Sequence, residues 1–404
     1  MKYRYGSSLG ELCDKRNAAV VSLGALAHNY SLLRGKIAES SPRTRVIAVV
    51  KSDAYGHGTP ACVRKLLALG CDFFAVSSLN EALAVRRACE DARADAEILI
   101  LGYTDPIHAS VLVRERLTQS LLSPDYADRL GREAAASGVT VRCHLAIDSG
   151  MNRIGFSVHE CDFDQTVSEI ERVRALDGLD VTGIFTHFAT ASRAAVDADA
   201  ERRARLQLDR FNRLRSHLSE CGGKPLFCHV CNSAASLLFP EYHLDGVRIG
   251  VSLYGVNPAD GVSLPLRPVM RLESEIAHLH TLRVGERVGY GASFGSDRER
   301  LIATLPIGYA DGFLRAYKGA EVTVLSESGS HRAEVVGNVC MDQCMIDVTD
   351  TDARIGDRVI LFGETADQIC ALAERAGSIP YESLCLVSAR VMRIYEEENE
   401  GENR

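Results

Sequence analysis

One lysine stands where an apolar segment meets a glycine-flanked turn. The apolar run Val46–Val50 is followed directly by Lys51, and Gly56 and Gly58 enclose the turn that comes next. If the run is a buried strand, the amine lies at its C-terminal end, where apolar surroundings lower a lysine pKa and favour Schiff-base chemistry. The alternative is a lysine that simply reaches solvent from a strand end. Position alone favours that alternative, so further residues must decide.

Polar or glycine residues also lie at the ends of three later apolar runs, and together they could bind one small anionic ligand. These residues are His187, His229, Asn232, Ser233, Arg248 and Gly250. In (β/α)8 barrels, the loops after the seventh and eighth strands often hold a phosphate through backbone N–H groups, hydroxyls and a helix N-terminus. Taken singly, Ser233 could equally cap a helix and Gly250 could equally form a tight turn.

The elements that must position these residues alternate regularly from about residue 44 to residue 250. The predicted strands are Arg45–Val50, Asp72–Ser77, Glu97–Leu101, Leu117–Leu122, Thr140–Ile147, Asp180–His187, Leu226–Val230 and Gly246–Ile249. Helical spacing of apolar residues separates them, as in Ala61–Leu69, Leu79–Cys89 and Ala204–Leu218. Because the strand and helix patterns repeat eight times, we predict an α/β fold with an N-terminal (β/α)8 TIM-like barrel, not an open doubly wound sheet.

The pattern changes after Pro258 and becomes mainly strand-like. The strand-like runs are Glu273–Leu282, Arg300–Leu305, Ala320–Leu325 and Arg358–Phe362, and a helical window at Thr365–Ala376 and an apolar run at Leu384–Tyr395 follow. We therefore predict a barrel domain over residues 15–262 and a mainly β C-terminal domain over 263–395 that also recruits the strand near 18–23. The tail 396–404 lacks apolar residues and is predicted to be disordered.

Composition narrows the class of protein. The 404 residues are 46% hydrophobic and 25% charged, which is typical of a globular chain. A net charge of -8 offers no basic field, so nucleic acid is not an expected partner. Neither an export signal nor a membrane span is indicated, and thirteen scattered cysteines suit reduced thiols. The sequence thus predicts a cytoplasmic protein that does not enter a membrane.

Six segments in the same order resemble the alanine racemase family of fold-type III pyridoxal 5′-phosphate (PLP) enzymes. The segments are Ala48–Gly58, Asp148–Gly155, Thr186–Thr190, Val288–Ala292, Pro306–Gly312 and Val339–Gln343. The resemblance extends from about Val20 to Tyr395. It implies a PLP-dependent isomerase that interconverts L- and D-alanine and supplies D-alanine for peptidoglycan of the bacterial cell wall.

The resemblance also implies the residues that bind the cofactor. Lys51 corresponds to the lysine that binds PLP through its amine. The positions around the phosphate correspond to Tyr55, Asn232, Ser233 and Gly250. Arg248 corresponds to the arginine that faces the pyridine nitrogen, and His229 to the histidine that braces it. Because a guanidinium does not readily give up its proton, the pyridine nitrogen stays neutral and the ring is a weaker electron sink.

Racemisation needs a second acid/base opposite Lys51, and the resemblance gives this role to Tyr290. A phenol, with an ordinary pKa near 10, needs a neighbour such as His187 to act near neutrality. On the residues alone, Tyr290 is more simply a packed strand aromatic. Since the tyrosine belongs to the β domain, the resemblance implies a head-to-tail homodimer with shared active sites. It further implies substrate contacts at Arg153, Met341 and Asp342, and an access corridor lined by Tyr309 and Arg315.

The sequence departs from the family pattern at four positions. Ala146 stands where many members carry a carbamylated lysine, so we predict no carbamylation there. In the corridor, Ser192, Asn338 and Ala389 replace the aspartate, arginine and tyrosine that are common in the family. A looser pocket rejects larger substrates less well, because fit discriminates by only about 1–3 kcal/mol per methylene. We therefore expect alanine turnover with unusual tolerance of serine or longer amino acids.

Three alternatives remain open. Cys228 and Cys231, with His229 between them and with Cys340 and Cys344 elsewhere, could suggest zinc, but no metal is predicted because that loop already has a cofactor role. A serine or broad-specificity racemase is the first functional alternative. A non-catalytic PLP-binding protein is the second. It is disfavoured, because a protein that only binds PLP does not need a second acid/base such as Tyr290.

Overall fold

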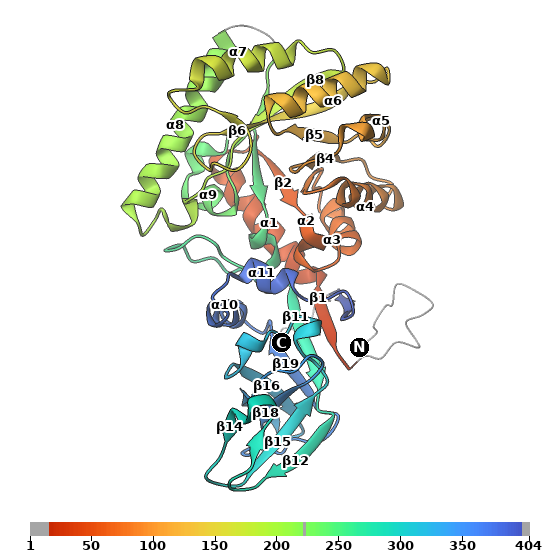
Figure 1. The fold of residues 1–404 in the computed structure, drawn as a ribbon, viewed down its shortest axis with the longest axis vertical. Helices are drawn as coiled ribbons and strands as arrows, with labels where there is room; N and C mark the ends of the chain where they lie inside the picture. Colours follow the sequence, from red (N-terminus) through yellow and green to blue (C-terminus); the bar gives the residue numbers. More distant parts are fainter. Residues whose placement is uncertain (1–15, 221–223, 398–404) are drawn as a thin grey trace.

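A computed structural model describes residues 16–220 and 224–397, and its first large sheet closes into a barrel (Figure 1). Eight parallel strands run in the order β5-β4-β3-β2-β10-β9-β8-β6, and β5 pairs back to β6. They are β2 (Arg45–Val49), β3 (Phe73–Val76), β4 (Glu97–Ile100), β5 (Thr118–Leu121), β6 (Val141–Asp148), β8 (Leu179–Phe185), β9 (Phe227–His229) and β10 (Gly246–Ile249). The short strand β7 (Phe156–Ser157) extends β6. The predicted (β/α)8 barrel is confirmed.

Helices cover the outer faces of the barrel strands. They are α1 (Leu23–Ser40), α3 (Thr59–Ala68), α4 (Leu79–Asp91), α5 (Ala109–Arg114), α6 (Pro124–Ala136), α7 (Phe163–Arg174) and α8 (Ala198–Glu220). The helix α1 leads from the second sheet into the first barrel strand, and the others connect barrel strands. Ser78 and Ser123 cap α4 and α6 by accepting backbone N–H groups, which satisfies donors that a helix leaves free. Most barrel strands are rich in apolar residues, as expected for strands with both faces buried, but β5 buries the polar residues Thr118, Gln119 and Ser120.

The second sheet is mostly antiparallel, in the order β12-β15-β18-β17-β16-β19-β11-β1-β20. Its strands are β1 (Ala18–Ser22), β11 (Met270–Glu275), β12 (His278–Leu282), β15 (Arg300–Leu305), β16 (Glu321–Ser326), β17 (Gly329–Val336), β18 (Cys344–Asp347), β19 (Arg358–Phe362) and β20 (Met392–Glu396). The first described strand, β1, pairs with β11 and β20 and so lies in this second sheet. The domain boundary at residues 262/263 stays a prediction.

Two expectations about the second domain need correction. The run Glu273–Leu282 is not one strand, because the chain changes neighbours at Ile276 and Ala277, whose N–H groups donate to Asp357 O and Thr304 O, each at 2.9 Å. The apolar run at 384–395 likewise divides between the end of α11 (Pro380–Cys385) and β20. β20 continues to residue 396, and the predicted tail beyond residue 397 lies outside the described residues.

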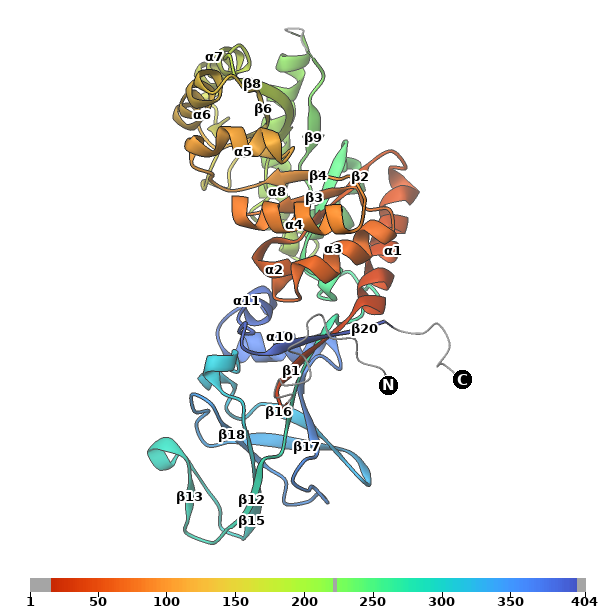
Figure 2. The same cartoon turned by 90° about the vertical axis from the view of Figure 1, so that its right-hand side faces the viewer.

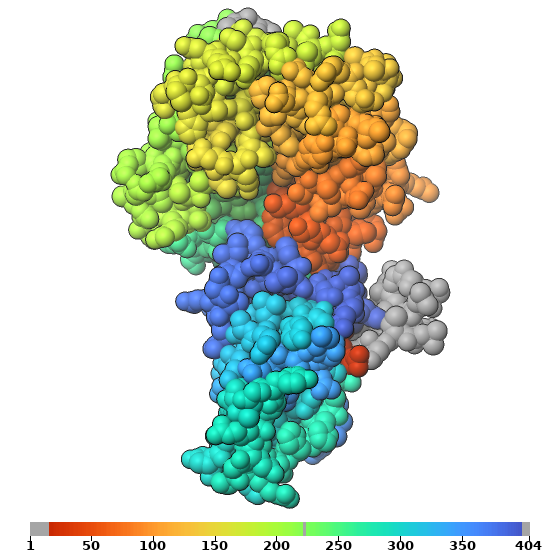
Figure 3. Space-filling model, viewed as in Figure 1, coloured from red at the N-terminus to blue at the C-terminus, as the bar shows by residue number. Residues whose placement is uncertain are grey.

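The barrel and the second sheet lie at opposite ends of the molecule (Figures 1 and 2). α10 (Ala366–Arg375) and α11 lie between them, and α11 packs against α2 (Lys51–Tyr55). Figure 3 shows a narrower waist at this level, where the blue C-terminal segment meets the orange-red N-terminal segment. Within residues 16–220 and 224–397, no helix has an apolar stretch long enough to cross a bilayer.

Candidate active site

The C-terminal end of the barrel brings together most of the residues singled out in the sequence. Lys51 follows β2, His187 follows β8, His229 ends β9, and Arg248 lies in β10 just before Gly250. Because the carboxyl ends of parallel strands meet at one end of a barrel, these side chains converge although almost 200 positions separate them in the chain.

Lys51 opens an unusual turn, α2. The four residues Ser52–Tyr55 all have φ between 52° and 54°, although none of them is glycine. The left-handed conformation costs an L-residue roughly 1–2 kcal/mol, so other contacts must maintain it. Glu81 accepts the Ser52 N–H at 2.7 Å, and Asp53 accepts the Thr59 N–H at 2.7 Å. The turn therefore holds Lys51 at the end of the strand, and its backbone is strained in doing so.

The electrostatic surroundings of Lys51 favour its neutral amine. Burial lowers the Lys51 pKa first, and the nearby Arg153 guanidinium lowers it further. His187 is affected in the same direction, since burial and the charge of Arg248 lower its pKa to about 3. A lysine that gives up its proton more easily and a neutral imidazole therefore share this end of the barrel.

Arg248 is buried and almost fully hydrogen-bonded. Its Nη1 donates to His229 Nδ1 and His229 O, both at 2.7 Å, and its Nη2 donates to Thr186 O at 2.6 Å and Val230 O at 3.0 Å. Burial lowers the Arg248 pKa to about 10, which still leaves the guanidinium charged at neutral pH. Four of the five guanidinium hydrogens thus point at these protein acceptors, and the Nε–H is the fifth donor.

A second group of donors surrounds Gly250. Its N–H donates to Ser233 Oγ at 2.8 Å, and a Cβ at this position would lie 2.5 Å from Tyr55 Oη. Ser252 Oγ is buried and has no hydrogen-bond partner among the described residues. Asn232 caps α9 (Ser233–Leu238) through its Oδ1, so the cap is Asn232 and not Ser233. Only glycine permits the close approach of the Tyr55 hydroxyl.

A separate set of predicted residues lies on the second domain. Tyr290 opens the short 3-10 turn η5 (Tyr290–Ala292) between β13 (Arg287–Val288) and β14 (Phe294–Gly295) and is 74% exposed. Asn338 Nδ2 donates to Tyr290 O at 2.7 Å. The Tyr309 N–H donates to Cys340 O at 3.0 Å, which brings the loop carrying Met341 and Asp342 beside Tyr309.

Within one chain, Tyr290 and Lys51 do not meet. Figure 2 shows β13 at the end of the second domain that faces away from the barrel, and α11 lies between that end and α2. Arg315 is exposed in the second domain, in the turn Arg315–Tyr317. The single chain therefore contains the two groups of predicted residues as two separate surfaces.

The positions that depart from the family pattern are also located. Ala146 is buried in β6, and Arg153 is exposed with no carboxylate in ion-pairing range in the described part of the chain. Ser192 lies in the turn Ala191–Arg193 on the barrel, and Ala389 is exposed beside Arg390. Arg153 thus has no fixed counter-charge here.

Comparison with known proteins identifies the family. Residues 21–258 match the family described as alanine racemase, N-terminal domain, and residues 269–395 match alanine racemase, C-terminal domain. The chain belongs to the alanine racemase family. The alanine racemase of Clostridium novyi is 36% identical over 388 residues, covering 93% of this chain and 94% of the relative.

Solved structures of family members have the same fold. The alanine racemase of Clostridium difficile 630 superposes with a TM-score of 0.85 at 34% identity, covering 96% of this chain and 97% of that one. The alanine racemase of Bacillus anthracis with bound L-Ala-P gives 0.82 at 31% identity, covering 95% and 96%. The expected family membership and enzyme class, an amino-acid isomerase, are confirmed.

Alanine racemase family enzymes depend on PLP, and the barrel end fits this cofactor. The Lys51 amine could bind the aldehyde of PLP, and the remaining Nε–H of Arg248 could donate to its pyridine nitrogen. The buried Ser252 hydroxyl, which lacks a partner among the described residues, and the close approach of Tyr55 to Gly250 suit a phosphate. The predicted cofactor is thus confirmed for the family, while the role of each residue stays a prediction.

Two residues near this alanine racemase site were missed in the sequence. Tyr381 of α11 places its ring 6.3 Å from the Tyr55 ring, and His144 of β6 lies behind His229. Tyr381 stands more than 300 positions after Tyr55, so only the fold brings them together. His144 gave a local signal, because it is the imidazole in an otherwise apolar stretch of a predicted strand.

The cysteines near the site act as protonated thiols. Cys228 Sγ donates to Leu226 O and Cys231 Sγ donates to Tyr242 O, both at 3.3 Å. Burial raises the pKa of both thiols, that of Cys228 to about 11. In residues 16–220 and 224–397, no three His, Cys, Asp or Glu side chains gather in a way that could hold a metal ion.

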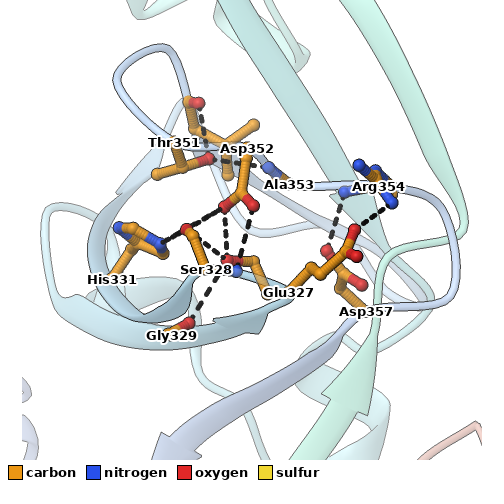
Figure 4. Close-up of polar contacts among 11 residues, drawn as sticks. Glu327, Ser328, Gly329, His331, Thr351, Asp352, Ala353, Arg354 and Asp357 are labelled. Atoms are coloured by element: carbon orange, nitrogen blue, oxygen red, sulfur yellow. Dashed lines mark hydrogen bonds and ion pairs between the residues drawn. The ribbon is translucent and has the colours of Figure 1, made fainter.

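A serine, a histidine and an aspartate also meet in the second domain, but not as a catalytic triad (Figure 4). Ser328 Oγ lies 2.8 Å from His331 Nε2, and Asp352 Oδ1 lies 3.3 Å from the same nitrogen. A triad needs the serine and the carboxylate on opposite ring nitrogens. Asp352 also accepts from Ser326 and Ser328, so the cluster closes the turn between β16 and β17.

Proposed function

We propose that this chain is a PLP-dependent alanine racemase with two acid/base groups, Lys51 and the Tyr290 of a second copy. The observation that carries the proposal is the end of the barrel, where Lys51, with its lowered pKa, and the buried, charged Arg248 converge. The relatives named alanine racemase, at 36% identity over 93% of the chain, support alanine as the substrate. The bound L-Ala-P of the Bacillus anthracis enzyme supports the same substrate.

PLP, when bound, draws electron density away from the α-carbon of the substrate and so acidifies its proton. Racemisation then needs a proton taken from one face of that carbon and a proton returned to the other. Lys51 Nζ serves one face, because burial lowers its pKa and so eases the loss of its proton. Tyr290 Oη serves the opposite face. Arg248 keeps its charge and would hold the ring nitrogen of the cofactor without giving up a proton.

The second half of the site comes from a partner copy. Tyr290 is 74% exposed, and β13, two residues before it, lies at the end of the second domain away from the barrel, so the tyrosine is available to cover another barrel. A two-fold, head-to-tail homodimer would build two such sites, each with Lys51 from one chain and Tyr290 from the other. Met341 and Asp342 would reach the substrate with Tyr290, and Arg153 of the barrel chain would bind the substrate carboxylate.

Substrate tolerance follows from the side chains along the corridor. Ser192, Asn338 and Ala389 are small or uncharged, and Tyr309 and Arg315 line the same approach in the proposed dimer. A wider corridor would admit serine and longer amino acids beside alanine. The scattered thiols, none of them paired among the eleven described, favour a reducing cytoplasm. There the enzyme would supply D-alanine for peptidoglycan.

The test uses purified holoenzyme in deuterium oxide with L-alanine or L-serine. Loss of the α-proton and appearance of the D-isomer are followed together, and Lys51→Ala is the control. Racemisation of alanine that disappears in the control is the expected result. Faster turnover of serine would make the protein a serine or broad-specificity racemase. PLP absorbance without exchange of any α-proton would instead indicate a PLP-binding protein without catalysis.

A further inference from the structure

A line of three buried side chains runs from the site into the barrel. Arg248 Nη1 contacts His229 Nδ1 at 2.7 Å, and His229 Nε2 contacts His144 Nδ1 at 3.0 Å. The three residues come from β10, β9 and β6, and none is more than 4% exposed. The His144 ring contacts His229, Phe73 and Phe227, and nothing in the proposed mechanism uses it.

The charge at one end of the line fixes the direction of every hydrogen bond in it. A guanidinium can only donate, so His229 Nδ1 must be the acceptor and carries no hydrogen. A neutral His229 then carries its hydrogen on Nε2 and donates it to His144 Nδ1. His144 in turn carries its own hydrogen on Nε2. The reverse order would point an N–H of His229 at an N–H of Arg248.

The surroundings keep both imidazoles neutral and in place. Burial, with Arg248 and other nearby cations, lowers the pKa of His229 well below its ordinary value and that of His144 to about 3. The His144 ring also packs on Phe227, with ring centroids 6.2 Å apart. A Cβ at Gly183 would lie 2.5 Å from the same ring, so glycine is needed to make room for it.

We infer that His144 is a positioning residue that holds His229 in its Nε2–H form and thereby aims Arg248 at the cofactor ring. The inference rests on the proposed function for its catalytic consequence, but the hydrogen-bond order it describes exists in the protein itself. Without His144, the His229 Nε2–H is buried without an acceptor. The free-energy cost of this unpaired donor favours rotation of the His229 ring or transfer of its hydrogen to Nδ1. Either change removes an acceptor from Arg248.

The test compares two substitutions of similar size. His144→Leu removes the acceptor, whereas the amide oxygen of His144→Asn can occupy the position of Nδ1 and accept the same hydrogen bond. His243→Leu is the control for loss of a buried histidine, because His243 Nε2 donates to Ser236 O at 2.8 Å, outside this line. All proteins are prepared with and without PLP and compared after confirming folding by circular dichroism.

The first readout is independent of catalysis. In the 15N-histidine NMR spectrum of the enzyme without PLP, we expect a slowly exchanging Nε2–H of His229 in the wild type and in His144→Asn. His144→Leu should lose that slow exchange. The second readout is racemisation by the loaded enzyme, where kcat/KM should fall about tenfold in His144→Leu and stay within about threefold in His144→Asn.

The outcomes separate the two hypotheses. Protected His229 Nε2–H in His144→Leu, or equal kcat/KM in the wild type and His144→Leu, would overturn the role of His144. An equal fall in kcat/KM in His243→Leu would also overturn it, because the loss would then be a general effect of core damage. If the wild type fails to racemise alanine while the NMR pattern follows the expectation, the proposed function fails and the hydrogen-bond order stands.

Discussion

The end of the barrel and the surface around Tyr290 hold their functional side chains in opposite ways. Arg248 is 4% exposed and makes hydrogen bonds to protein acceptors on several sides. Tyr290 is 74% exposed, and the recorded bond from Asn338 reaches its backbone carbonyl and not its phenol. One surface is organised before anything binds to it. The other presents a side chain that gains its surroundings only when another surface covers it.

The largest expected effect tests whether these two surfaces form one site between two chains. Lys51→Ala and Tyr290→Phe should each lower kcat for racemisation by about 10²–10⁴-fold, since each removes one acid/base group. Refolding the two inactive variants together should restore about a quarter of the wild-type activity, because mixed dimers contain one intact site. The measurement is D-alanine formation before and after mixing.

The matched control is Tyr103→Phe, because Tyr103 is another exposed tyrosine, on the barrel, that has no role in the proposal. It should keep wild-type activity. If mixing Lys51→Ala with Tyr290→Phe restores nothing although analytical ultracentrifugation detects mixed dimers, the shared site is wrong. Activity of Tyr290→Phe close to wild type would remove the tyrosine from the mechanism.

Acid should weaken the barrel, because a buried histidine stays neutral in the folded state at a pH where the unfolded chain already protonates it. Burial lowers the pKa of His57 to about 4, against about 6.5 in an unfolded chain. Between these values the unfolded state binds more protons, so the free energy of unfolding falls as pH falls from 6.5 towards 4. Each such histidine contributes about 1.4 kcal/mol per pH unit in that window.

His57→Asn isolates one of these contributions. His57 Nδ1 lies 2.9 Å from Ala54 O and from Tyr55 O, and an asparagine amide can donate from the same position. Denaturant titrations of the variant should therefore lose about 1.4 kcal/mol less per pH unit than the wild type between pH 6.5 and 4. Above pH 7.5 the two slopes should coincide. Identical slopes in the acid range would contradict a neutral buried His57.

A smaller effect is expected where a backbone approaches the cofactor site. Gly250→Ala places a Cβ 2.5 Å from Tyr55 Oη, so the hydroxyl must move away from the predicted phosphate position. We expect PLP affinity to fall by about tenfold, the equivalent of one lost hydrogen bond to a charged group. Spectroscopic titration of the enzyme without PLP measures it.

Gly35→Ala is the control for this substitution, because nothing lies within 4 Å of a Cβ at Gly35 and the residue is inside α1. It should bind PLP normally and gain about 0.5–1 kcal/mol of stability from its higher helix propensity. Unchanged PLP affinity in Gly250→Ala would mean that the Tyr55 hydroxyl does not take part in phosphate binding.

The sequence allowed good prediction of the barrel because its signal is local and repeated. Most of the buried strands contain a short apolar run, and chemistry-bearing residues such as Lys51 follow such runs directly. The turn after Lys51 could not be predicted, because Ser52–Tyr55 adopt left-handed φ values without a glycine. Hydrogen bonds that no sequence pattern indicates hold them there, including the long-range bond from the Ser52 N–H to Glu81.

The second domain was harder to predict for a different reason. β17 (Gly329–Val336) carries mostly exposed polar side chains in its first half, so it lacks the apolar alternation of a half-buried strand. The break between β11 and β12 depends on which neighbour each segment pairs with. Neighbours of the site such as Tyr381 are found only when distant segments meet. Spatial pairing of this kind is not encoded in a local pattern.

The smallest expected effect concerns how Tyr290 is held. Asn338 Nδ2 donates to Tyr290 O at 2.7 Å, so this side chain, predicted as part of the corridor, also holds the turn that carries the tyrosine. Asn338→Ala should lower kcat about threefold, the equivalent of one neutral hydrogen bond at a surface. The same substitution in a Tyr290→Phe background should have no further effect on kcat, because nothing is left for the turn to position. If the two effects on kcat simply multiply, Asn338 acts on the corridor and not through Tyr290, and the exposed surface is then held by its own backbone geometry alone.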